Sequence, residues 1–183
     1  MTDQTRTEQS ETHKSFATGH ALVIGISAYQ AIIGPLPDAC KHDAENLAQL
    51  LMSPACGYSA ANVTKLIDGE ATLKNILAGL SQLVAASKEE NSVLNFFSGH
   101  GALIPGGSDT SALIPVDCDS SYPLSSVLLE SALSSALSGI KAQKFLVMLD
   151  ACHSGAAALL KASGKGSLFV YEEKSLSRVA SGI

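Results

Sequence analysis

Two short motifs carry the residues that could do chemistry in this chain. Ser98-Gly99-His100-Gly101 and Asp150-Ala151-Cys152-His153-Ser154-Gly155 each follow an apolar, strand-like run, at residues 93–97 and 145–149. If both runs are strands of one parallel sheet, the motifs lie at the same edge of that sheet, and an imidazole meets a thiol there. Cysteine is a nucleophile as its thiolate, and a neighbouring histidine commonly provides one near neutral pH. The pair therefore predicts a cysteine hydrolase.

The residues around each member of this pair favour a functional site over a packed core. His100 lies between two glycines, which permit a close approach of the backbone. Cys152 precedes His153-Ser154-Gly155 and the small residues 156–158, so we expect a strand-to-helix turn that exposes the thiol at a helix N-terminus, where the dipole favours the thiolate. The alternative for Cys152 is a small buried hydrophobic residue, the usual environment of a lone cysteine.

Composition limits the class of protein. With 183 residues, 46% hydrophobic and 16% charged, the chain can bury one core and is expected to form one domain. A net charge of −5 argues against a nucleic-acid partner and leaves acidic subsites for a cationic substrate open. No apolar run reaches the roughly 20 residues that span a bilayer, so we expect no membrane association. Four cysteines without a CxxC pair suggest a reducing, cytoplasmic location: Cys40, Cys56, Cys118 and Cys152.

Apolar patterning predicts the elements that position the motifs. Continuous apolar runs of strand length stand at residues 21–26, 63–67, 93–97 and 145–149. Apolar residues at helical spacing fill three segments: 39–52 after the predicted capping carboxylate of Asp38, 73–84 after the capping Thr72, and 127–140 after Ser125 or Ser126. A hairpin is expected from residues 102–104 and 112–114. Strands alternating with helices predict an α/β sandwich with a mostly parallel sheet.

Three regions are expected along the chain. Residues 1–19 are polar without periodicity and predict a flexible N-terminal arm. Residues 20–160 hold all the strands and helices above and form the predicted catalytic domain. Residues 161–183 are polar around one apolar stretch, 168–170, and are expected to form an exposed linker or processing segment.

The motifs, in order, resemble those of the caspase-like cysteine peptidases of clan CD, and within them the metacaspases and bacterial orthocaspases. The resemblance runs from residue 21 to about residue 155 and rests on ALVIGI, LPDACKHDA, FFSGHG, ALIPVD and LVMLDACHSG. The histidine precedes the cysteine by 152 − 100 = 52 residues, close to the spacing of about 50 in caspases. The resemblance implies a caspase-hemoglobinase-like three-layer α/β/α fold of the large-subunit type and endopeptidase activity. It implies that His100 is the general acid and base, that Cys152 is the nucleophile, and that the backbone N–H groups of Gly101 and Cys152 form the oxyanion hole.

Acidic residues predict the specificity of cleavage. Caspases that cleave after aspartate carry arginine next to the cysteine, and His153 stands there in this chain. Asp43 and Asp150 are expected at the same sheet edge, where a partly desolvated carboxylate pair favours arginine, then lysine, before the scissile bond. In metacaspases the matching positions, here Cys40, Asp43, Ser98 and Asp150, line the pocket for that residue. The alternatives are compensation of the helix dipole by Asp43 and loop capping by Asp150.

The resemblance leaves calcium as a separate question. Many metacaspases are activated by calcium through an aspartate pair near the start of the third helix, where this chain has Ser125-Ser126, and through a later acid, where it has Leu159. Turn formation explains the remaining acidic residues as well as ion binding does. We therefore expect no metal or other cofactor, and the residues that could still supply oxygen ligands are Asp109, Asp117 and Asp119.

A caspase-like fold usually completes its sheet with a small subunit that carries two further strands. After Cys152 this chain has one strand-like run, at residues 168–171. Either the chain is cut in its basic linker, with a second polypeptide pairing beside the fourth strand, or the natural gene is short and a separate small-subunit-like partner covers the edge. For an enzyme that prefers basic residues, the candidate sites of self-processing are Lys161, Lys165, Lys174 and Arg178.

Two other classes of function compete with a peptidase. The chain could be a catalytically silent interaction module, although such proteins typically lose the histidine or the cysteine, and both are present. A redox or metal site could use Cys152, His153 and His100, although these residues lack the CxxC or H-x₃₋₅-H spacing of that chemistry.

Overall fold

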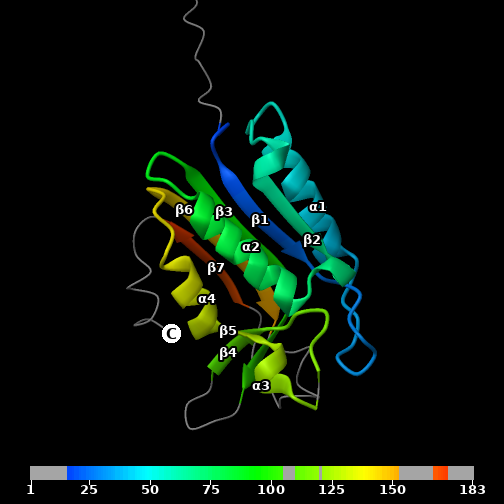
Figure 1. The fold of residues 1–183 in the computed structure, drawn as a ribbon. Coiled ribbons are helices and arrows are strands. Elements are labelled where there is room, and N and C mark those ends of the chain that lie inside the picture. The colour runs from blue at the N-terminus through cyan, green and yellow to red at the C-terminus, as the bar shows by residue number, and fades with distance from the viewer. Residues whose placement is uncertain (1–15, 105–109, 120, 153–166, 173–183) are drawn as a thin grey trace, which may run out of the picture.

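The protein is described by a computed structural model that covers residues 16–104, 110–119, 121–152 and 167–172. A sheet lies between helices on both of its faces (Figure 1). Its strands are β1 (His20–Gly25), β2 (Val63–Ile67), β3 (Ser92–Ile104), β4 (Thr110–Leu113), β5 (Leu128–Leu129), β6 (Lys144–Cys152) and β7 (Ser167–Glu172). The helices are α1 (Ala39–Met52), α2 (Leu73–Ala86), α3 (Pro123–Ser126) and α4 (Glu130–Leu137), with 3₁₀ turns η1 (Ala60–Asn62) and η2 (Asp68–Glu70).

Strand β3 pairs with three other strands, two of them parallel and one antiparallel. Its first part lies between β1 and β6, and the four strands β2, β1, β3 and β6 are parallel, while β7 pairs antiparallel with β6. Its last residues, from Gly101 to Ile104, leave β6 and pair antiparallel with β4, which in turn pairs with β5. Figure 1 shows β4, β5 and α3 beyond the carboxyl ends of the parallel strands. The site residues of β3 therefore lie where its parallel pairing ends and its antiparallel pairing begins.

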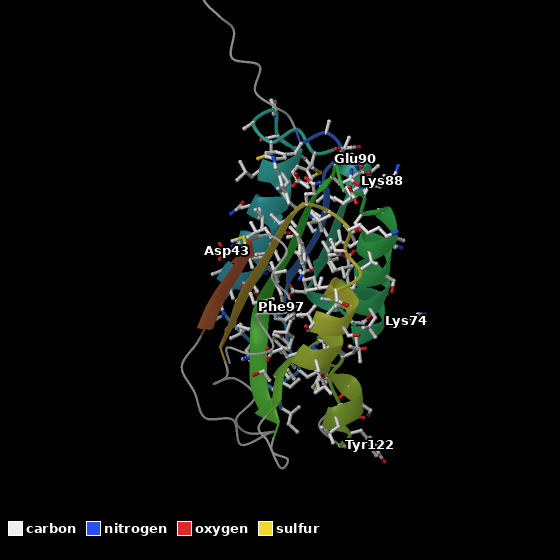
Figure 2. The ribbon with its side chains drawn as sticks, turned by 90° about the vertical axis from the view of Figure 1, so that its left-hand side faces the viewer. Asp43, Lys74, Lys88, Glu90, Phe97 and Tyr122 are labelled. Atoms are coloured by element: carbon white, nitrogen blue, oxygen red, sulfur yellow. The ribbon has the colours of Figure 1, made fainter. Side chains whose placement is uncertain are left out.

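The two faces of the sheet have separate apolar cores because side chains alternate along each strand. Ala21 and Val23 of β1 and Leu94 and Phe96 of β3 pack against α1 on one face. Their neighbours Leu22 and Ile24 pack against α2 on the other face, in a cluster that also includes α4. Figure 2 shows this edge-on, with α1 on one side and α2 with α4 on the other. The predicted three-layer α/β/α architecture is confirmed.

The described helices also bear on the membrane prediction. None of them combines the length and the apolar character that a bilayer span requires.

Thr72 caps α2 as predicted, because its Oγ1 accepts from the Asn75 N–H at 3.2 Å. Asp38 precedes α1 but makes no side-chain capping hydrogen bond, since its carboxylate pairs with Lys41 Nζ at 2.7 Å instead. That predicted cap was wrong.

Two other expectations differ from the structure. The expected third helix, 127–140, is reduced to α4, because Leu128 and Leu129 pair with β4 as a short strand. The predicted capping serines, Ser125 and Ser126, lie in the separate short helix α3, and α4 begins after Leu129. Within the expected linker, residues 167–172 form β7 rather than loop, and β7 takes the outer side of β6. The sequence suggested that a second polypeptide pairs directly beside β6. That position is taken by β7, so this prediction is wrong.

Candidate active site

The register of the parallel strands aligns the two motifs. His100 of β3 is the Cα partner of Cys152 of β6, and Ser98 is the partner of Asp150. The prediction that the motifs lie at one edge of the sheet holds at the level of the backbone. It differs in one detail, since the residues lie inside β3 and β6 rather than in loops after them. The side chain of Cys152 and residues 153–166, where we predicted a helix N-terminus, lie outside the described part.

His100 is buried with its ring in a defined orientation. Its exposed fraction is 3%, and its Nε2 lies 2.9 Å from the carbonyl oxygen of Gly34. Because a carbonyl can only accept, Nε2 carries the hydrogen, and in the neutral ring Nδ1 holds a lone pair. Among the described residues Nδ1 is buried without a hydrogen-bond partner. The neutral imidazole thus has its basic nitrogen unoccupied by any described residue.

The pKa of His100 is lowered from its ordinary value of 6.5, mainly because burial disfavours the charged ring. The hydrogen bond to the Gly34 carbonyl acts in the opposite direction and raises the pKa, since the charged ring is the better donor. The neutral form, which can accept a proton, therefore predominates at neutral pH.

Tyr29 joins the backbone of His100 to that of Ile114, the residue after β4. Its hydroxyl accepts from the His100 N–H at 2.9 Å and donates to the Ile114 carbonyl at 2.9 Å. Burial raises the pKa of Tyr29 far above its ordinary value, so the hydroxyl keeps its proton. The Tyr29 ring packs against the imidazole with centroids 4.6 Å apart. A side chain at Gly99 would stand 2.6 Å from the hydroxyl, so this glycine makes room for the contact.

The loop between β1 and α1, residues 26–38, presents the Gly34 carbonyl. Gly34 has a φ of +93°, a conformation that other residues adopt only with strain. Its N–H and that of Ile33 both donate to the Gln30 carbonyl, at 3.0 Å each. The acceptor for the imidazole is therefore fixed by a tight turn rather than by a side chain.

The four predicted pocket residues come from β3, β6 and α1. Ser98 is fully buried and donates to an Asp150 carboxylate oxygen at 3.4 Å, and across β3 its Cα partner is Gly25 of β1. The turn of α1 that carries Cys40 and Asp43 rests on Gly25, where an added Cβ would lie 2.7 Å from the Cys40 carbonyl oxygen. Gly25, over which this turn lies, and Asp150 are thus separated by two strand spacings within the sheet, about 10 Å.

Solvent exposure corrects one expectation about these acids. Asp43 and Asp150 are both exposed, so the carboxylates are not the partly desolvated pair that the sequence suggested, while Cys40 is half-buried. Asp43 lies on the α1 side of the sheet (Figure 2). Asp43 lies beyond the first turn of α1, which holds no acidic residue, and this position argues against compensation of the helix dipole as its role. Exposed carboxylates at this edge remain accessible to a cationic ligand.

The backbone direction of Gly101 bears on the predicted oxyanion hole. The carbonyl of His100 accepts from the Ile114 N–H at 3.0 Å, so the peptide groups of His100 face β4. Because the polar groups of successive strand residues alternate in direction, the Gly101 N–H points to the opposite side, where β6 lies. Donation by Gly101 and Cys152 to an oxyanion stays a prediction.

The acidic residues considered as ion ligands have local roles where they are described. Asp117 accepts from the Leu73 N–H at 2.8 Å and so caps α2, and Asp119 accepts from the Ser121 N–H at 2.8 Å within its own turn. Asp109 lies outside the described residues. In the part of the chain that the structure describes, no three His, Cys, Asp or Glu side chains group as a metal site. Activity without calcium stays a prediction.

A cavity of about 470 Å³ opens at the other end of the strands. It is mostly apolar, and Phe145 and Leu146 of β6 line it together with Leu94 of β3. These β6 residues precede Cys152 by six or seven positions, about 20 Å along a strand. The cavity is therefore separate from the candidate active site.

Sequence reasoning did not identify Tyr29 or the Gly34 carbonyl as parts of the site. Gly34-Pro35 marks a turn in the sequence, but a main-chain acceptor has no residue type that reveals its partner. A lone tyrosine four residues after a buried strand carries no distinctive signal either.

Comparison with known proteins places the fold among cysteine peptidases. The model of the caspase domain family matches residues 18–178. The chain is 30% identical over 149 residues to "Metacaspase III c" of Phaeodactylum tricornutum (strain CCAP 1055/1), covering 75% of this chain and 43% of that relative. The solved structure of protein GSU0716 from Geobacter sulfurreducens superposes with a TM-score of 0.61 at 24% identity, covering 75% of this chain and 51% of that chain, and shows a shared fold. The chain thus spans about half the length of the proteins it matches.

Proposed function

This chain belongs to the caspase domain family, a family of cysteine peptidases, and we propose that it is an endopeptidase of the metacaspase type that cleaves protein chains after arginine and, less readily, after lysine. The observation that carries the proposal is the pairing of His100 with Cys152 in the register of β3 and β6, with the Nδ1 lone pair of the imidazole unoccupied by any described residue.

The proposed reaction uses both residues in turn. Nδ1 of His100 takes the proton of the Cys152 thiol, and the thiolate sulfur attacks the carbonyl carbon of the scissile bond. The imidazolium then gives that proton to the leaving amine, the C–N bond breaks, and an acyl-thioester remains. Water, deprotonated by Nδ1, attacks the thioester carbonyl, the acid product departs, and the sulfur regains a proton from the imidazolium.

The surroundings of His100 support these roles. Its hydrogen bond to the Gly34 carbonyl selects the tautomer that can act as a base at Nδ1, and it strengthens when the ring is charged, as the imidazolium state requires. Burial keeps the resting ring neutral. In the proposal, the N–H groups of Gly101 and Cys152 donate to the oxyanion that forms on the substrate carbonyl.

The preference for basic residues is proposed from the four residues that line the predicted pocket. Asp150 and Asp43 would accept hydrogen bonds from a guanidinium, and Ser98 would hold the Asp150 carboxylate through the 3.4 Å contact. Arginine is favoured over lysine because its planar fork can bind two oxygens at once. Cys40 would form the half-buried wall between them.

Maturation is proposed to involve cleavage in the 161–183 segment. Such an enzyme could cut itself after one of the basic residues there, and a small-subunit-like chain would then complete the sheet at β7, the strand outside β6. The candidate cleavage sites are Lys161, Lys165, Lys174 and Arg178.

The test is a comparison of short fluorogenic peptides that end in arginine, lysine or aspartate before the reporter, with and without calcium. We expect release from the arginine peptide, less from the lysine peptide, and none from the aspartate peptide. Cys152→Ala should abolish release while keeping the thermal unfolding midpoint. Absence of cleavage by the wild type, together with slow alkylation of Cys152 by iodoacetamide, would favour a silent interaction module instead.

A further inference from the structure

We propose that Asp68, in the turn after β2, is a positioning residue of the candidate active site. It acts through the loop between β1 and α1, which brings the Gly34 carbonyl to His100. The inference rests on the proposed function, because it concerns the same histidine, but its main test does not require peptide cleavage.

The carboxylate of Asp68 anchors the start of this loop. One oxygen, Oδ1, accepts from the Ser27 N–H at 2.7 Å and from the Ala28 N–H at 2.9 Å. Hydrogen bonds to an ionised acceptor are shorter and stronger than neutral ones. Asp68 itself has a φ of +45°, so the backbone is held in a left-handed conformation at the residue that makes both contacts.

Ser27 forms hydrogen bonds with both ends of the loop. Its carbonyl accepts from the Leu36 N–H at 2.9 Å and from the Tyr29 N–H at 3.1 Å. Its hydroxyl donates to the Pro37 carbonyl at 2.9 Å and accepts from the Lys41 N–H at 3.2 Å. Ser27 is 2% exposed, so these bonds have little competition from water. One residue thus connects the start of the loop, its end and the first turn of α1.

The two contacts of the loop with His100 lie between these tied ends. The hydroxyl of Tyr29, two residues after Ser27, accepts from the His100 N–H, and the Gly34 carbonyl accepts from Nε2 of His100. Without the Asp68 carboxylate, the Ser27 and Ala28 N–H groups lose their acceptor, and the buried one must shift to find another. The loop then no longer fixes the Gly34 carbonyl at 2.9 Å from the imidazole.

The test compares Asp68→Ala and Asp68→Asn with a matched control, Asp117→Ala. Asp117 also accepts from a backbone N–H, that of Leu73, but it caps α2 rather than the loop. The first readout is the pH titration of the His100 ring by NMR. Since the bond to Gly34 raises the pKa of His100, Asp68→Ala should lower that pKa further, and Asp117→Ala should leave it unchanged.

Two kinetic readouts accompany the titration. For the arginine peptide, kcat of Asp68→Ala should fall on the order of tenfold with KM within about twofold, below the roughly 100-fold that a misplacement of 1 Å can cost. The pH profile of Cys152 alkylation by iodoacetamide should move as the imidazole moves. Asp68→Asn keeps an acceptor oxygen and tolerates the left-handed backbone, so it should restore most of the wild-type titration.

The inference is overturned if Asp68→Ala and Asp117→Ala lower the unfolding temperature alike and both leave the His100 titration unchanged, because Asp68 is then only structural. Should Asp68→Ala not fold, Asp68→Gly replaces it, since glycine accepts the positive φ without strain. If the wild type cleaves no peptide, the proposed function fails, while the titration and alkylation still decide the role of Asp68.

Discussion

His100 and Asp150 stand on neighbouring strands, two residues apart in register, and are held in opposite ways. His100 is buried, its N–H and Nε2 both have partners, and an aromatic ring packs against it. Asp150 is exposed and receives one long hydrogen bond from Ser98. A group that moves protons must be oriented before substrate arrives, whereas a group that binds a cation must be free to exchange water for it. The contrast matches the two proposed roles.

Replacing His100 should give the largest effect and test the first half of this contrast. His100→Ala removes the base and should lower kcat for every peptide that the wild type cleaves by about 10²- to 10⁴-fold, regardless of the residue before the scissile bond. Steady-state kinetics on arginine and lysine peptides check this. If His100→Ala lost activity on the arginine peptide alone, His100 would act in substrate binding rather than in proton transfer, and the contrast with Asp150 would fail.

Replacing Asp150 should affect specificity rather than chemistry. Asp150→Asn removes one charged acceptor, so kcat/KM for the arginine peptide should fall on the order of 10- to 100-fold. Asp43→Asn should act in the same direction. For both variants the rate of Cys152 alkylation should stay near that of the wild type, because the thiol and imidazole are unchanged. Altered alkylation would show that the acids act on the nucleophile.

A smaller effect on kcat is expected when Gly34, whose carbonyl accepts the hydrogen bond from the His100 ring, is replaced. Gly34→Ala places a side chain at a φ of +93°, which costs about 1–2 kcal/mol of unfolding free energy, or else turns the carbonyl away from His100. We expect a loss of up to about tenfold in kcat with little change in KM. Gly69→Ala is the matched control, since a Cβ at either glycine meets open space and only Gly34 has a positive φ. Equal behaviour of the two variants in urea unfolding and kinetics would contradict the assignment.

The smallest effect is the pH dependence of stability. Because burial lowers the pKa of His100 in the folded protein, the unfolded chain binds more protons between that value and about 6.5. The free energy of unfolding therefore rises with pH in this window and falls on acidification, by about 1.4 kcal/mol for each unit of pKa difference at most. His100→Gln should lose less stability than wild type between pH 7 and 5 in urea titrations.

His20 needs a control in that experiment. Its pKa is also lowered, by burial first and by Lys88 second, so it contributes the same sign of pH dependence. Because His20 is present in both proteins, its contribution cancels in the difference between wild type and His100→Gln. Identical pH profiles for the two proteins would contradict a lowered pKa at His100.

The sequence was sufficient to predict the parallel strands that carry the candidate site. Apolar runs of strand length located β1, β2, β3 and β6, and parallel pairing of the last two is enough to align His100 with Cys152. Two predictions failed where tertiary pairing overrode a local pattern. Leu128 fits the apolar stripe of the predicted helix but pairs with β4, together with Leu129. Residues 167–172 stand in a polar segment that predicts a loop but pair with β6.

The parts that sequence reasoning missed are held by backbone groups or depend on exposure. The Gly34 carbonyl and the N–H groups of Ser27 and Ala28 are backbone groups. Nearly every residue type carries the same groups, so the residue type does not reveal their hydrogen-bond partners. The exposure of Asp150 depends on how the strand end is covered, which the alternation of residues along β6 does not determine. The family motifs identified the reacting residues without identifying what holds them.

The hydroxyl of Tyr29 stands between a donor and an acceptor that would otherwise meet directly. One rung of the ladder that continues β3 into its antiparallel partner is thus spanned by a phenol instead of an N–H to carbonyl bond. The other bond of the same residue pair, from the Ile114 N–H to the His100 carbonyl, is direct at 3.0 Å, so the pair opens on one side only, at the residue whose ring packs against that of Tyr29. A replacement of Tyr29 would therefore change the pairing of His100 with Ile114 and the ring contact of the imidazole at the same time.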